Sequence, residues 1–354
     1  MSRPRLGPRR IFCPTPVRRG TGARCRVAWR GLGTRPVRPG GTVLAVGKKS
    51  MKGNTATLIL NPKAGRGGAA AAGEVALFCE RARAGGVTVE VRPTEGPGDA
   101  VRLAAEAARG GAFAVVVRGG DGTVHEAIQG LAGSGARLLV WPAGTANVLA
   151  RQLGLPASAE GAARVLVGGR ARRISLGLAT SGRTGERRYF FMLAGVGLDA
   201  SVVQSVRPGL KRRVGEVAFW YAGLGHLARW RPRVFHVEVD GERLPATYAA
   251  VGKAPWYGGG LAITPRARLE AEEFEVCVIN TRSRLRYLRL LGRAMRGGVA
   301  PEGAPGVCFR RVKHVRATGE APVQADGELI GELPMTFEVA PEGIEVIVPE
   351  ESRQ

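Results

Sequence analysis

The sequence predicts a parallel α/β domain over residues 54–173 and a mostly antiparallel β domain over residues 174–348. In the first region, short apolar runs alternate with helical stretches, and the runs end in polar loops, most of them rich in glycine. This alternation predicts a Rossmann-like parallel sheet with helices on both faces. In the second region, strand-like segments follow one another with few helices between them, which is typical of an antiparallel β-sandwich. A chain of 354 residues is long enough for two such cores.

The clearest strand, loop and helix of the first domain surround Gly119–Thr123. The preceding run Ala114–Val117 is short, apolar and bounded by glycine, as expected for a buried parallel strand. Val124, Ile128 and Leu131 follow at spacings of four and three, which predicts one face of a helix. Glycines let backbone N–H groups approach a ligand closely, and a helix N-terminus attracts anions. The loop therefore predicts a phosphate site.

Asp121 is the unusual member of this loop, because a carboxylate would repel a bound phosphate. Its presence is explained if a divalent cation lies between the two. The alternative is a tight turn between strand and helix with a solvated aspartate.

Three further loops are predicted at the same sheet edge, where ligands of parallel α/β sheets bind. Asn61–Gly68 follows the strand Ala56–Leu60 and lacks the GK[ST] of a Walker loop. Thr94 follows the strand Val87–Arg92, and Pro142–Asn147 follows the strand Leu138–Trp141. The helices expected between these strands are 70–84, 98–109 and 148–153.

The second domain is expected to contain seven strands and two helices. The strands are Tyr189–Leu193, Val234–Val239, Tyr248–Val251, Phe274–Ile279, Val312–Ala317, Val323–Ala325 and Met335–Val339. The helices are Val214–Arg229 and Arg284–Arg296. The last strands of the chain could return to the first domain.

The charge distribution and the cysteines bear on the N-terminal segment and on the cellular location of the protein. More than half of the net charge of +24 falls in residues 1–52, which contain no Asp or Glu. We interpret residues 1–53 as a disordered tail that could bind nucleic acid or anionic lipid, or as a segment preceding a true start at Met51. Five scattered cysteines and the lack of a membrane-spanning run predict a cytoplasmic protein with reduced thiols.

Taken together, the loops resemble the diacylglycerol kinase catalytic family in its bacterial lipid kinase branch, which is related to sphingosine and ceramide kinases. The matching motifs are Asn61–Gly65, Thr94, Gly119–Thr123 with Glu126 and Gly130-Leu131, Pro142–Asn147, Gly195–Ala200, Gly258–Gly260 before Pro265, and Asp326–Glu328. The resemblance covers about residues 54–348 and implies phosphorylation of a lipid hydroxyl by ATP, in a nucleotide cleft between the two domains. It implies that ATP and Mg²⁺ are the cofactors. The implied nucleotide-binding residues are Asn61, Gly65, Thr94, Gly119, Gly120, Asp121, Gly122, Thr123, Val124, His125, Thr145 and Asn147, with Asp121 also engaging Mg²⁺.

The family's catalytic base lies in the motif Asp326-Gly327-Glu328. We favour Glu328, with Asp326 aiding it or binding metal, because a base must be a carboxylate or histidine within reach of the hydroxyl. If the segment is extended, the two carboxylates lie on one face. The alternative is that Asp-Gly marks a hairpin turn.

Three positions depart from the family pattern. Val148 and Ser175 occupy two positions at which the family has acids. Those acids resemble members of a metal–water network around Asp121. Ala271 replaces the aspartate of a second, structural metal site; Glu270 or Glu272 could compensate, but Arg268 nearby argues against that metal. A catalytically weak or inactive lipid- or nucleotide-binding protein is therefore the alternative function, and an NAD kinase is a more distant one.

The predicted helix Arg284–Arg296 suggests where a membrane could bind. Leu285, Leu288, Leu291 and Met295 share one face and arginines surround it, as in helices that lie on anionic membrane surfaces. A second basic and aromatic stretch covers 207–233. The alternative is that the apolar face packs on the β domain. We expect a lipid substrate, peripheral contact with the inner face of the membrane and no nucleic acid. The sequence leaves the oligomeric state open, with a homodimer among the options.

Overall fold

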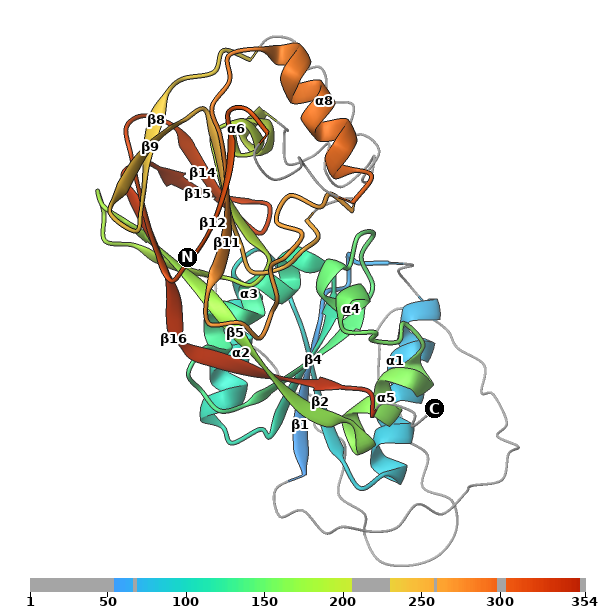
Figure 1. The fold of residues 1–354 in the computed structure, drawn as a ribbon. Helices are drawn as coiled ribbons and strands as arrows, with labels where there is room; N and C mark the ends of the chain where they lie inside the picture. Colours follow the sequence, from blue (N-terminus) through green and yellow to red (C-terminus); the bar gives the residue numbers. More distant parts are fainter. Residues whose placement is uncertain (1–53, 66–68, 206–229, 258–259, 298–303, 351–354) are drawn as a thin grey trace, which may run out of the picture.

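The computed structural model describes residues 54–65, 69–205, 230–257, 260–297 and 304–350 (Figure 1). The predicted fold class is confirmed: a parallel α/β domain is joined to an antiparallel β domain (Figure 1). The predicted helix Val214–Arg229 lies outside the described residues. Among the described residues, no helix is long and apolar enough to cross a membrane.

The first domain is built on four adjacent parallel strands. Every residue of its β3 strand is buried, which agrees with the unbroken apolar pattern of a strand covered on both faces. In spatial order the strands are β2 (Thr88–Pro93), β1 (Thr55–Leu60), β3 (Ala114–Gly119) and β4 (Arg137–Pro142). The helices are α1 (Ala69–Ala84), α2 (Asp99–Arg109), α3 (Asp121–Leu131), α4 (Val148–Gln152) and α5 (Ala159–Gly168).

Helices α2 and α3 pack together on one side of the sheet, and α1 and α5 pack on the other (Figure 1). Helix α5 was not predicted, although Ser158 is an N-cap that accepts a hydrogen bond from the Gly161 N–H. At the contact of α2 with α3, the Glu126 carboxylate accepts the Ala100 N–H. Gly130 of α3 faces the α2 backbone, and a Cβ there would lie 2.3 Å from the Val101 carbonyl oxygen.

Two long strands connect the domains. β5 (Arg170–Ser181) and β16 (Met335–Val348) pair antiparallel, from Met335 with Ser181 to Val348 with Arg170. β16 also pairs parallel with β4 of the first domain and antiparallel with β13 of the second. The expected domain boundary at residue 173 therefore falls inside β5, and both strands run from one domain into the other (Figure 1).

The second domain is a sandwich in which a six-stranded antiparallel sheet packs on the far part of the larger sheet. The six strands in spatial order are β12 (Val307–Val312), β11 (Phe274–Ile279), β10 (Tyr248–Gly252), β7 (Leu193–Val196), β14 (Pro322–Ala325) and β15 (Glu328–Glu332). The facing layer contains β13 (His314–Thr318), β8 (Phe235–Val239), β9 (Glu242–Ala246) and β6 (Arg187–Phe190), together with parts of β5 and β16. Within the described part of this domain, the helices α6 (Leu198–Ser205) and α8 (Arg284–Ala294) flank it.

Two strands predicted as single elements are each divided. The expected strand Tyr189–Leu193 contains the end of β6 and the start of β7, and Val312–Ala317 contains parts of β12 and β13. In both cases the chain leaves one sheet and enters the other. The apolar pattern continues through the crossing because both sheets face the same core, which includes Phe190, Phe274 and Phe337.

The close approach of α2 and α3 predicts a stability effect. Gly130→Ala should lower the free energy of unfolding by about 1–3 kcal/mol, because a methyl group there meets backbone rather than a movable side chain. Gly73→Ala is the control: this exposed glycine of α1 has nothing within 4 Å of a Cβ, so alanine should raise stability by about 0.5–1 kcal/mol. Urea denaturation measures both, and equal effects would contradict the packing argument.

Candidate active site

The loops after the four parallel strands meet at one edge of the sheet, as the sequence predicted. Backbone hydrogen bonds join neighbouring loops: the Asn61 N–H donates to the Arg118 carbonyl at 2.9 Å, and the Ala143 N–H donates to the Gly119 carbonyl at 3.0 Å. Thr94 extends the group on the far side, since its N–H donates to the Leu60 carbonyl at 2.8 Å. The ends of β1 to β4 therefore form one continuous rim.

Glycines allow these loops to touch. A Cβ on Gly144 would lie 2.6 Å from the Gly120 Cα, and a Cβ on Gly119 would lie 2.7 Å from the Thr123 side chain. The Asn61 side-chain amide donates to the Thr123 hydroxyl at 2.9 Å, which ties the first loop to the third. The structure thus brings together the loops that contain the predicted nucleotide residues.

Three of the predicted nucleotide-binding residues lie in or against the fourth loop. Gly65 has a positive φ of 73° and lies against the fourth loop, where a Cβ would be 3.0 Å from the Ala143 carbonyl oxygen. The Asn147 side chain closes its own loop, accepting the Gly144 N–H at 2.9 Å and donating to the Gly144 carbonyl at 2.6 Å. Thr145 between them is exposed at the rim.

Asp121 is the first residue of α3 and links the phosphate loop to α4. Its Oδ1 accepts the Val148 N–H at 2.9 Å. Burial raises the pKa of its carboxyl, a backbone N–H from Val148 opposes that rise, and the nearby Asp326 carboxylate adds to it. The described residues contain no group of three His, Cys, Asp or Glu side chains that could hold a metal by themselves. A single carboxylate is enough for a Mg²⁺ ion that is bound to a nucleotide, because that ion keeps phosphates and waters as its other ligands.

Asp326 lies in a hairpin turn, so the condition of an extended segment, under which both carboxylates would share one face, is not met. Asp326 and Gly327 have φ values of 49° and 86° and join β14 to β15, as an Asp-Gly turn favours. The Asp326 carboxylate is buried and accepts N–H groups from Phe191, Met192 and Leu193 at 2.9, 2.9 and 3.0 Å. The turn interpretation is confirmed, and the turn also brings the Asp326 and Glu328 carboxylates to the rim of the first domain.

Glu328 is the carboxylate that reaches the phosphate loop. It begins β15, its side chain is 44 % exposed, and its Oε1 lies 3.4 Å from where a Cβ on Gly122 would be. Its Oε2 is 4.0 Å from Nε2 of His125. A side chain of the second domain thus faces the loop of the first domain, in the open part of the site.

His125 bridges the two domains, which the sequence did not indicate. Its buried ring places Nδ1 3.1 Å from Oδ2 of Asp326, with Nε2 toward Glu328. Burial lowers the pKa of this imidazole, but the Asp326 hydrogen bond and the two carboxylate charges outweigh burial and raise the pKa overall. The sequence feature that could have indicated this role is the position of His125 four residues after Asp121, on the same face of α3.

A second buried carboxylate supports the hairpin from behind. Oδ2 of Asp199, in α6, accepts the Gln324 amide at 2.8 Å, and Oε1 of Gln324 accepts the Gly327 N–H at 2.7 Å. Burial raises the pKa of Asp199 to about 6. Gly195 provides the space, because a Cβ there would overlap the Asp199 carboxylate.

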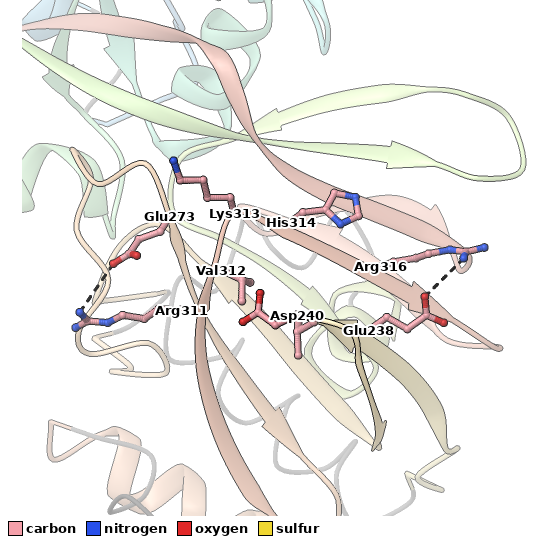
Figure 2. A pocket seen from close by; sticks show the side chains of 10 residues that line it. Glu238, Asp240, Glu273, Arg311, Val312, Lys313, His314 and Arg316 are labelled. Atoms are coloured by element: carbon pink, nitrogen blue, oxygen red, sulfur yellow. Dashed lines mark ion pairs between the residues drawn. The ribbon is translucent and has the colours of Figure 1, made fainter.

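A groove of about 690 Å³ lies elsewhere, between the β8–β9 turn and strands β12 and β13 (Figure 2). Its lining is charged, and the ion pairs Arg311–Glu273 and Arg316–Glu238 lie at two sides of it (Figure 2). None of the predicted catalytic or nucleotide-binding residues lines this groove.

Comparison with known families confirms the resemblance. Residues 55–179 match the diacylglycerol kinase catalytic domain, and residues 193–348 match the YegS C-terminal NAD kinase beta sandwich-like domain. The chain therefore belongs to this lipid kinase family, whose members are phosphotransferases.

Related proteins match this chain along most of its length. A diacylglycerol kinase of Mycobacterium tuberculosis strain H37Rv is 33% identical over 299 residues, which cover 83% of this chain and 94% of that protein. A probable lipid kinase YegS-like protein of Chromohalobacter salexigens is 33% identical over 281 residues, covering 77% and 86%. A crystal structure of a diacylglycerol kinase from Bacillus anthracis superposes with a TM-score of 0.67 at 21% identity over 84% of this chain and 98% of that one, which shows the shared fold.

The two carboxylates of the hairpin should respond differently to loss of charge. Asp326→Asn should lower the free energy of unfolding by about 1–3 kcal/mol, because one of its buried acceptor oxygens becomes an amide facing N–H donors. Glu328→Gln should change it by less than about 0.5 kcal/mol, since the side chain is partly exposed. Thermal and urea unfolding measure both, and an equally large loss for Glu328→Gln would show that Glu328 has a structural role.

Proposed function

We propose that the protein is an ATP-dependent lipid kinase that transfers the γ-phosphoryl group of ATP to a lipid hydroxyl. One observation carries the proposal: the Glu328 carboxylate of the β domain faces Gly122 in the glycine loop of the α/β domain. A phosphoryl group held by the loop and a hydroxyl beside the carboxylate would then be neighbours. Phosphoryl transfer needs mainly this positioning and neutralised charge.

The first domain would hold the nucleotide. Backbone N–H groups at the start of α3 favour phosphate, and the glycine contacts keep the loop shape that lets a ligand approach them. Asp121 would hold Mg²⁺, which neutralises charge on the phosphates when bound. Because Asp121 also accepts the Val148 N–H, the same carboxylate joins the phosphate loop to the loop of Thr145 and Asn147.

Glu328 would act as the base. Its partly exposed carboxylate can meet a substrate hydroxyl from the open side and accept its proton. Asp326 is buried among three N–H donors and cannot reach that side, so we assign it a positioning role. It holds the turn and the His125 ring, and the ring limits where Glu328 can lie.

Helix α8 would bring the protein to an anionic membrane surface. Tyr287, Leu290 and Ala294 form its buried side. Leu285, Leu288 and Met295 lie outside that side, with 69, 41 and 60 % of their surfaces exposed. Leu291, the fourth member of the predicted apolar face, is partly buried and packs against the core, so the packing alternative holds for Leu291 and not for the other three side chains. Exposed apolar side chains beside arginines favour contact with anionic lipid.

The alternative function is a lipid- or nucleotide-binding protein with weak or no turnover. Its support is the small number of acids near Asp121: Val148 bonds Asp121 through its backbone N–H, and its apolar side chain offers no second carboxylate that could help hold a metal. The two functions share the fold and differ in measured phosphoryl transfer.

Transfer of labelled phosphate from ATP to a panel of hydroxylated lipids tests the function. Glu328→Gln should lower turnover by about 10²–10⁴-fold through loss of the base, and Asp121→Asn should reduce it nearly to background. Glu332→Gln, an exposed carboxylate of the same hairpin, is the control and should retain activity.

Two outcomes would contradict parts of this proposal. Transfer that survives in the double variant Asp326→Asn, Glu328→Gln would remove the assigned base. ATP binding without transfer to any lipid would favour the binding-protein alternative.

Co-sedimentation with vesicles tests the membrane surface. The protein should bind phosphatidylglycerol vesicles more tightly than phosphatidylcholine vesicles, and less tightly as salt increases. The triple variant Leu285→Ser, Leu288→Ser, Met295→Ser should weaken binding at least about tenfold, since three apolar side chains no longer enter the lipid. Val167→Ser removes a similarly exposed side chain of the first domain as control, and equal losses would exclude α8 as the contact.

A further inference from the structure

Lys253 is a buried lysine that the proposed reaction does not use. It follows β10, and its side chain is fully buried in the second domain. Its ammonium donates to the carbonyl oxygens of Ala271 and Glu273, the latter at 3.2 Å. Its Nζ also lies 5.8 Å from the centre of the Phe274 ring. A buried lysine is costly unless it is paired, so this arrangement requires an explanation.

The same carbonyl-rich turn is held from its other side by β5. The Ser175 hydroxyl donates to the Ala271 carbonyl at 2.6 Å, and the Ser175 N–H donates to the Leu269 carbonyl at 2.8 Å. The turn between Leu269 and Glu273 thus directs backbone oxygens toward Ser175 and Lys253. Ser175 belongs to a strand that runs through both domains, so the turn lies at their junction.

Carbonyl oxygens gathered in this way are ligands suited to a hard cation such as Mg²⁺ or Ca²⁺. Relatives are expected to bind a structural metal through an acid at the position of Ala271. This chain does not fit such a metal, because Ala271 has no carboxylate and the Lys253 ammonium already occupies its carbonyl oxygen.

Nearby acids partly offset the cost of burying this ammonium. Burial lowers the pKa of Lys253 to about 8, and the charges of Glu270, Glu273 and Glu272 oppose burial and raise it. Two of these acids have other partners: Glu270 pairs with Arg172, and Glu273 pairs with Arg311 at 3.9 Å in the charged groove (Figure 2).

We propose that Lys253 is a built-in cation that takes the place of a divalent metal at the domain junction and fastens the turn 269–273 to β5 and β10. The proposal does not depend on the reaction that the protein catalyses.

The segment that carries the lysine is linked through Met192 to the hairpin of the candidate base. The backbone N–H of Lys253 donates to the Met192 carbonyl at 2.8 Å, and the Met192 N–H donates to the Asp326 carboxylate at 2.9 Å. The residue whose ammonium holds the turn 269–273 is thus two backbone hydrogen bonds away from Asp326, in the hairpin that carries Glu328.

The first test needs no variant. The melting temperature of the nucleotide-free protein is measured in EDTA and after addition of Mg²⁺ or Ca²⁺, and its metal content is determined after purification without chelator. We expect the same melting temperature in every condition and no stoichiometric metal. A melting temperature that falls in EDTA, or one tightly bound divalent ion per chain, would overturn the proposal.

A second test removes the cation. Lys253→Met keeps the length of the side chain but leaves carbonyls unpaired beside three acids, so we expect the melting temperature to fall by about 5–15 °C. Lys313→Met, an exposed lysine of the second domain, is the matched control and should change little. Equal melting temperatures for Lys253→Met and the parent protein would overturn the proposal.

A third test exchanges the lysine for a metal. In Lys253→Ala, Ala271→Asp, a carboxylate joins the freed carbonyls, so Mg²⁺ or Ca²⁺ should raise the melting temperature and EDTA should reverse the rise. Ala271→Asp alone keeps the ammonium and should show no such response. A folded double variant without any divalent-dependent rise would overturn the proposal, because the carbonyl cluster would then not be a cation site.

Discussion

The pairing of β5 with β16 is the constraint on which the site depends. Each strand passes through both domains, and their ladder extends from Met335 with Ser181 to Val348 with Arg170. Because β16 also pairs with β4, the second domain is joined by backbone hydrogen bonds to the sheet that carries the glycine loops. The position of Glu328 opposite Gly122 follows from this shared sheet, since neither residue reaches the other within its own domain.

Next to this shared sheet, each buried carboxylate of the site has a hydrogen-bond partner. Asp326 has three backbone N–H donors and the His125 ring, Asp121 has the Val148 N–H, and Asp199 has the Gln324 amide. Each pairing compensates the loss of water around a carboxylate. Glu328 differs because it keeps solvent access, and this difference in environment is the reason that we propose Glu328 as the base and Asp326 as a positioning residue.

The domain junction and the proposed membrane-binding helix illustrate two different uses of basic side chains. Lys253 is buried and directed at carbonyl oxygens, where an ammonium can act as a fixed cation. The arginines of α8 instead lie beside the exposed Leu285 and Met295, where long side chains can meet anionic lipid headgroups. Composition alone counts both as positive charge, and only burial distinguishes them.

Local sequence determined the parts of this protein that depend on neighbouring residues. Alternating strands and helices predicted the α/β domain, glycines predicted the loops at its sheet edge, and Asp326-Gly327 contained a turn signal. These signals succeed because a parallel strand, a positive φ and a helix face are each encoded within a few residues.

Tertiary structure decided what joins distant segments. Sequence could not show that His125 meets Asp326, which lies 201 positions away, or that Lys253 meets the turn that Ser175 also holds. Nor could it show that the chain changes sheets between β6 and β7, because both sheets bury the same kind of apolar side chain in one core. Such contacts depend on how the sheets are ordered and paired, and on which polar groups lose water when they pack.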